Sequence, residues 1–90
     1  MKLSQELLTN LIEITSNSAI ACYPYIGKNE KILADKAATD VMRYELNKLN
    51  IKGKVVIGEG ELDEAPMLYI GEELGSGIGP EIDIAVDPVE

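Results

Sequence analysis

The chain has 90 residues, with no histidine and a single cysteine, and both shortages narrow the chemistry available to it. Without histidine, these residues hold neither an imidazole general base nor a histidine-bearing zinc site. Cys22 stands alone, so it forms no intrachain disulfide and no cysteine-rich metal centre, which fits a reducing compartment. The Gly-x-Ser-x-Gly elbow of serine hydrolases is missing too. What remains is chemistry carried by carboxylates.

Long apolar runs are also absent. The segment from Met1 to Glu6 lacks the apolar stretch of a signal peptide, and no segment approaches the roughly 20 apolar residues of a membrane span. Apolar residues make up 46% and charged residues 27% of the chain, so it should fold rather than stay disordered. We therefore expect a cytoplasmic protein that does not associate with membranes.

Basic residues are missing from the second part of the chain. Residues 1–54 carry eight basic and six acidic side chains, for a net charge of +2, whereas residues 55–90 carry ten acidic side chains and no basic one. This second part would repel nucleic-acid phosphates. It is either a solvated acidic surface or a site for a cation, because clustered oxygen ligands without an internal counter-ion favour a divalent metal.

Apolar periodicity predicts two helices. The first spans residues 4 to 22, with Ser4 as N-cap and Pro24 ending it. The second spans residues 32 to 49 and stops near Gly53. The residues expected on the apolar stripe of the first helix are Leu7, Leu8, Leu11, Ile12, Thr15 and Ala19. Those of the second are Ala34, Ala38, Val41, Met42, Leu46 and Leu49.

After the helices, the period changes to that of strands. Short β-branched or alternating segments predict strands at residues 54–57, 67–70 and 81–87, with a glycine-rich turn at residues 74–80. Pro88 cannot continue a ladder and ends the last strand. Two helices followed by three strands predict an α/β or α+β layered fold, in which the helices pack on the sheet.

The last predicted strand ends in a pair of acids. Asp87 follows an apolar strand, and ligands in α/β sheets bind at the carboxyl ends of strands. Glu90 lies three residues later, across the turn that Pro88 imposes. Two carboxylates aimed at one spot repel each other unless they share a proton or a metal, and hard oxygen ligands suit Mg²⁺ or Mn²⁺. The alternative is a strand end with two solvated acids.

An earlier strand also leads into an acidic loop, Gly58 to Glu64. Gly58 and Gly60 flank Glu59 and permit backbone angles that aim its carboxylate at a ligand; the alternative is a plain glycine-rich acidic turn. Near the start of the second helix stands Asp35, which the helix dipole alone would explain. Lys31, four residues earlier, is either a surface lysine or a phosphate contact.

Three segments together resemble the class II fructose-1,6-bisphosphatases. They are VVIGEGELDEAPMLYIGE (residues 55–72), EIDIAVDPVE (residues 81–90) and, less tightly, LADKAA (residues 33–38). The resemblance covers all 90 residues and is most specific from Gly53 onward. One departure is the segment before Lys31, which reads GKNEK where the family has GRGDK.

The resemblance implies the fold and the roles of the site residues. The family belongs to the lithium-sensitive, inositol-monophosphatase-like phosphatases, whose fold is an α/β/α/β/α sandwich. By matching positions, Asp35 and Glu59 would bind one Mg²⁺ or Mn²⁺, and Asp87 and Glu90 the second, with Glu90 also beside the substrate phosphate. Asp63 would lie near the attacking water. Lys31 would contact the phosphate of the sugar bisphosphate.

The resemblance also implies that residues 1–90 are the N-terminal part of a single sugar-phosphatase domain, cut after its first metal-binding strand. The remaining site residues would then lie beyond Glu90, and the 90 residues alone would be inactive. The expected protein hydrolyses the 1-phosphate of fructose 1,6-bisphosphate and forms dimers or tetramers. The alternatives are a sedoheptulose-1,7-bisphosphatase, an enzyme remnant, or a non-catalytic acidic metal-binding or interaction domain.

Overall fold

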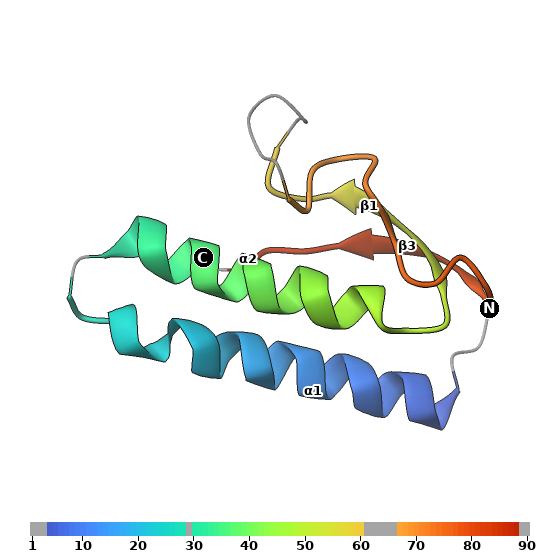
Figure 1. Cartoon of the computed structure of the whole chain (residues 1–90), viewed down its shortest axis with the longest axis horizontal. Coiled ribbons are helices and arrows are strands. Elements are labelled where there is room, and N and C mark those ends of the chain that lie inside the picture. The colour runs from blue at the N-terminus through green and yellow to red at the C-terminus, as the bar shows by residue number, and fades with distance from the viewer. Residues whose placement is uncertain (1–3, 29, 61–66, 89–90) are drawn as a thin grey trace.

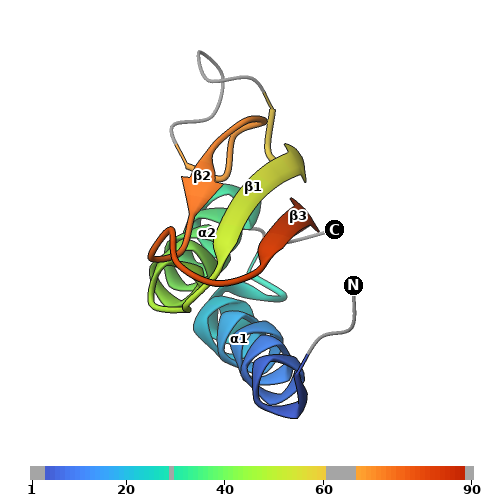
Figure 2. The ribbon, with the colours of Figure 1, turned by 90° about the vertical axis from the view of Figure 1, so that its right-hand side faces the viewer.

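The structure is a computed structural model that describes residues 4–28, 30–60 and 67–88. Two antiparallel helices form one of its layers. Helix α1 spans Gln5–Cys22 and helix α2 spans Lys31–Asn47, and they run side by side (Figures 1 and 2). Ser4 caps α1 as predicted, since its hydroxyl accepts the Leu7 N–H at 3.1 Å. The chain leaves α1 through a 3₁₀ turn, Tyr23–Tyr25, which contains Pro24.

The second layer is a three-stranded mixed sheet. Strands β1 (Lys52–Ile57), β2 (Glu73–Leu74) and β3 (Glu81–Ala85) lie in the order β2-β1-β3. Strand β1 pairs antiparallel with β2 and parallel with β3. Both helices lie on one face of the sheet, which gives the α+β layering predicted from the sequence (Figure 2). Within the described ranges, neither helix is long and apolar enough to cross a membrane.

The core lies between the helices and the sheet. It is formed by buried residues from both layers: Ile14, Leu46, Val55, Leu68 and Leu74. A second, smaller cluster joins the ends of the helices near the turn between them, through Cys22, Ala34 and Ala38. The small side chains of Ala34 and Ala38 let α1 and α2 approach closely there, as the predicted stripe of α2 requires.

The predicted stripe of α1 is only partly right: Leu7 is buried and Leu11 packs against the core, but other members of the stripe are exposed. Ile12, Thr15 and Ala19 are exposed, whereas Ile14 and Ser18 are buried. Apolar residues occupy both sides of this helix, so the spacing alone allowed two orientations. Ser18 tolerates burial because its hydroxyl donates to the Ile14 carbonyl at 2.8 Å.

The strand predicted at residues 67–70 is also wrong. These residues form a turn, and the ladder partner of β1 is instead Glu73–Leu74. Leu68 has a left-handed backbone, with φ of 55°, and Gly71 has φ of 96°, so the segment cannot extend as a strand. The strands predicted at 54–57 and 81–87 are confirmed as β1 and β3, with ends shifted by two residues.

Candidate metal site

The topology brings three of the predicted ligands to one end of the molecule. Because β1 and β3 are parallel, their carboxyl ends lie together, and the first turns of α2 lie at that same end (Figure 1). Asp35 stands in the second turn of α2, Glu59 two residues after β1 and Asp87 two residues after β3. Segments far apart in sequence therefore converge on one acidic region.

Glu59 is the best-described member of this group. Its carboxylate accepts a hydrogen bond from the Thr39 hydroxyl at 3.0 Å. Burial raises the pKa of Glu59 above the ordinary glutamate value, as do a side-chain hydrogen bond with Asp35 and the negative charges of Asp35 and Asp87. The Thr39 hydroxyl acts in the opposite direction, because it stabilises the ionised form. Asp35 and Glu59 therefore lie close enough for their carboxyl groups to interact directly.

A divalent cation fits this donor set. In the described residues, none of the ion pairs involves Asp35, Glu59 or Asp87, so no basic side chain balances their charge by direct contact. A hard cation bound by oxygen ligands would offset the repulsion between these carboxylates. The fit is partial, since no three Asp, Glu, His or Cys side chains of the described ranges lie close enough to hold a metal by themselves. Asp87 acts on Glu59 only through its charge.

The backbone around Glu59 is held by a close approach to the turn at residues 67–72. The Glu59 N–H donates to the Leu68 carbonyl at 2.9 Å. A Cβ on Gly58 would lie 2.2 Å from that same carbonyl oxygen, so only glycine fits there. Gly60 has φ of 136°, a conformation that side chains rarely adopt. The unusual backbone angle that the sequence predicted is therefore present at Gly60, whereas Gly58 is needed for the close approach to Leu68.

The other predicted residues contribute less to the described site. Lys31 is the first residue of α2, is exposed, and has no ion-pair or side-chain hydrogen-bond partner among the described residues. Asp63 and Glu90 lie outside the described residues. Their proposed roles beside the water and the phosphate therefore remain predictions.

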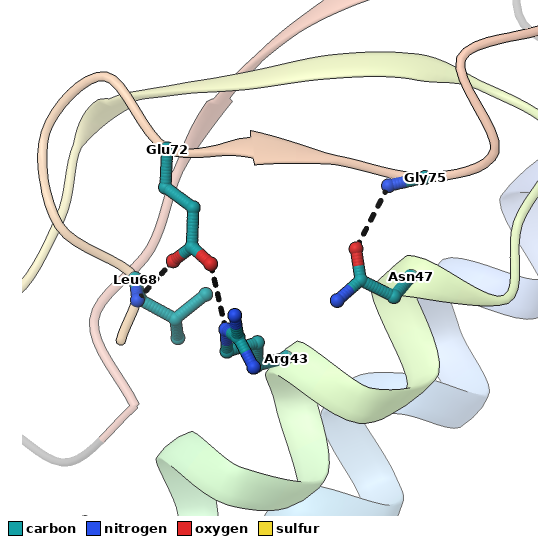
Figure 3. Close-up of polar contacts among 5 residues, drawn as sticks. All are labelled: Arg43, Asn47, Leu68, Glu72 and Gly75. Carbon is teal, nitrogen blue, oxygen red and sulfur yellow. Dashed lines mark hydrogen bonds and ion pairs between the residues drawn. The ribbon is translucent and has the colours of Figure 1, made fainter. Parts of the chain in front are cut away.

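Sequence reasoning missed Thr39 and a half-buried ion pair between α2 and the turn at residues 67–72. Thr39 lies four residues after Asp35, so helical spacing alone places both on one face of α2. The ion pair joins Arg43 of α2 to Glu72, just before β2, over 29 residues of sequence (Figure 3). No local pattern signals such a contact.

Several known proteins are similar to this chain. Residues 5–90 match the family described as bacterial fructose-1,6-bisphosphatase, glpX-encoded. The chain is 52% identical over 86 residues to the Escherichia coli fructose-1,6-bisphosphatase 1 class 2. It is 53% identical over 88 residues to a D-fructose 1,6-bisphosphatase class 2/sedoheptulose 1,7-bisphosphatase of Synechococcus. These alignments cover 96% and 98% of this chain but 26% of each relative, so the chain spans about a quarter of the length of these relatives.

Proposed function

This chain belongs to the bacterial, glpX-encoded fructose-1,6-bisphosphatase family, and we propose that the whole protein hydrolyses the 1-phosphate of fructose 1,6-bisphosphate. The products are fructose 6-phosphate and inorganic phosphate. The observation that carries the proposal is the convergence of Asp35 and Glu59, with the charge of Asp87 nearby, at one end of the sheet. Residues 1–90 would be the N-terminal part of a single phosphatase domain.

In this proposal the acidic side chains hold two divalent cations, Mg²⁺ or Mn²⁺. Asp35 and Glu59 contribute to one cation site, and Asp87 and Glu90 to the other. When bound, such cations activate water and neutralise charge on the phosphate oxygens. Thr39 fixes one Glu59 oxygen through its hydrogen bond. Asp63 orients the attacking water, and Lys31 contacts the phosphate from the start of α2.

A second activity has a specific observation in its favour. Relatives from Prochlorococcus and Synechococcus that are 52–53% identical over 88 residues carry both the fructose 1,6-bisphosphatase and the sedoheptulose 1,7-bisphosphatase names. Both substrates present a phosphate on the first carbon of a sugar. We therefore propose sedoheptulose 1,7-bisphosphate as an alternative substrate of the same site.

The family resemblance also supports the wider setting of the enzyme. We propose a cytoplasmic homo-oligomer, a dimer or tetramer, that acts in gluconeogenesis on a sugar bisphosphate. Nucleic acid is not a partner in this proposal, because residues 55–90 carry ten acidic side chains and no basic one.

The direct test is phosphate release by the complete protein encoded by the reading frame that contains this chain. The two bisphosphates are compared with Mn²⁺, with Mg²⁺ and with a chelator. We expect release that depends on added metal and stops with the chelator. A folded protein that releases no phosphate from either sugar under any of these conditions would overturn the proposal and favour a non-catalytic metal-binding domain.

A further inference from the structure

We propose that Glu72, whose carboxylate also pairs with Arg43 of α2, is a positioning residue for the metal ligand Glu59 and acts through the backbone of Leu68. This inference rests on the proposed function, because it assumes that Glu59 binds a metal. Figure 3 shows Glu72 between the two groups that it joins, the Arg43 side chain and the Leu68 backbone. Neither residue of the pair belongs to the proposed ligand set.

The first step is the carboxylate of Glu72, which bridges helix α2 and the turn at residues 67–72. One oxygen accepts the Arg43 Nε–H at 2.6 Å, and the other accepts the Leu68 N–H at 2.5 Å. The Glu72 side chain is only 5% exposed, whereas that of Arg43 is 39% exposed. A buried carboxylate with both oxygens engaged by charged or backbone donors is held in one orientation.

The second step is the backbone of Leu68. This buried, non-glycine residue has φ of 55°, a left-handed conformation that is unfavourable for residues with a side chain. The Glu72 carboxylate offsets that cost by accepting the Leu68 N–H. Strained residues persist when their surroundings fix them, and they concentrate at functional sites.

The third step joins Leu68 to Glu59. With Leu68 in this conformation, its carbonyl accepts the Glu59 N–H at 2.9 Å and packs against Gly58, where no Cβ would fit. A second bond, from the Ile70 N–H to the Gly60 carbonyl at 2.9 Å, fastens the other side of the loop. The contacts from Arg43 to Glu59 are therefore continuous. Arg43 pairs with Glu72, Glu72 accepts the Leu68 N–H, and the Leu68 carbonyl accepts the Glu59 N–H. Groups that hold metal ligands in this way affect affinity without touching the metal.

The test compares two double variants of the complete protein. Arg43→Met/Glu72→Leu and Arg43→Met/Glu72→Gln both remove the charge pair, and replacing both residues leaves neither charge without its partner. Only the glutamine keeps an oxygen that can accept the Leu68 N–H. The Mn²⁺ dissociation constant is read without substrate, from the signal of free Mn²⁺ in electron paramagnetic resonance.

We expect the leucine variant to bind Mn²⁺ about 10-fold or more weakly than the wild type, as is usual when support of a metal ligand is lost. The glutamine variant should recover most of that affinity. Equal dissociation constants for the two double variants, whatever their melting temperatures, would overturn the inference.

Asn47→Ala is the matched control. Asn47 lies on the same helix, one turn beyond Arg43, and its side-chain oxygen accepts the Gly75 N–H at 3.1 Å, next to β2 (Figure 3). The Asn47→Ala substitution loosens the contact between α2 and β2, and Asn47 has no hydrogen bond to Leu68. We expect a lower melting temperature and an unchanged Mn²⁺ dissociation constant. A higher Mn²⁺ dissociation constant in Asn47→Ala would mean that general packing, rather than the contacts through Leu68, sets the affinity.

A measurement on the wild type keeps the inference testable if the leucine variant does not fold. Coupling is reciprocal, so a turn that positions the metal ligand must itself be stabilised by the metal. Mg²⁺ should slow hydrogen exchange in peptides from the turn at residues 67–72, and unchanged exchange would contradict the inference. Failure of the proposed function is a separate result, namely wild-type protein that releases no phosphate in the presence of metal.

Discussion

The carboxyl group of Glu59 lies where burial, a hydrogen bond to Asp35 and two neighbouring negative charges oppose its ionisation. In the metal-free protein its pKa is therefore raised. The resulting contribution to stability is complete below the unfolded-state pKa and is lost as the pH rises through the higher folded-state value. A bound divalent cation reverses this preference, because it favours the ionised form. If Glu59 binds metal as proposed, protons and metal compete for one position.

This competition predicts a pH-dependent metal affinity. The Mn²⁺ affinity of the complete protein should fall as the pH drops through the raised pKa of Glu59. In Thr39→Val the hydrogen bond that favours the ionised form is lost, so the pKa should rise further. Near pH 6 we expect Mn²⁺ binding about three- to tenfold weaker than in the wild type, the equivalent of one hydrogen bond.

The measurement is Mn²⁺ titration across pH, with Thr15→Val as the control. Thr15 is an exposed threonine of α1 whose hydroxyl donates to the Leu11 carbonyl at 3.1 Å. This control removes the same group elsewhere and should leave the pH profile unchanged. Superimposable profiles for Thr39→Val and the wild type would show that Glu59 does not compete with protons for the metal.

Among the elements, those with one clear pattern could be predicted from the sequence. The predicted Ala34, Ala38 and Leu46 of α2 are buried, although the buried Thr39 was not predicted. Ile82 and Ile84 of β3 are half-buried and alternate with exposed residues, as predicted. Helix α1 has apolar residues on both sides, so contact with α2, rather than spacing, decided which side is buried. Strand β2 is only two residues long and follows a turn held by Glu72, a contact that no local rule contains.

The residues of the site also divide into those that the sequence predicts and those that only the structure reveals. Asp35, Glu59 and Asp87 were predicted from strand ends, glycine spacing and the family resemblance. Helical spacing places Thr39 on the same face of α2 as Asp35, but no sequence motif marks this threonine as a site residue. The contacts of Glu72 with Arg43 and Leu68 arise from tertiary packing and could be found only in the structure.

The close packing of β1's end on the 67–72 turn predicts different outcomes for two glycine variants. A Cβ on Gly58 would press on the Leu68 carbonyl, whereas at Gly77 nothing lies within 4 Å and only its φ of 86° opposes a side chain. Each alanine should destabilise the protein, by about 1–3 kcal/mol for overpacking at Gly58 and about 1–2 kcal/mol for the left-handed backbone at Gly77.

Metal binding separates the two glycine variants, because only Gly58→Ala displaces the carbonyl that holds the Glu59 N–H. Thermal melting and Mn²⁺ titration of the complete protein measure both effects. We expect Gly58→Ala to weaken Mn²⁺ binding and Gly77→Ala to leave it unchanged. Wild-type affinity in a folded Gly58→Ala variant would argue against this account of the loop.

Across the whole molecule, charge and topology point to the same end. All ten charged side chains of residues 55–90 are acidic. The parallel strands β1 and β3 place Glu59 and Asp87 at the edge of the sheet where α2 begins. Two explanations of metal binding follow from this distribution. Either the acidic field as a whole attracts cations, or particular carboxylates hold them. A field effect depends on net charge, whereas coordination depends on position.

The measurement that separates them is metal-dependent phosphate release from fructose 1,6-bisphosphate by the complete protein, with Asp87→Asn compared with Asp83→Asn. Both variants remove one negative charge, and Asp83 is an exposed residue of β3 only four positions earlier. We predict that Asp83→Asn keeps activity within about twofold of the wild type, since surface charges contribute little. Asp87→Asn should lose about 100-fold or more, because it removes a proposed metal ligand. Equal activities in the two variants would contradict the proposed metal site.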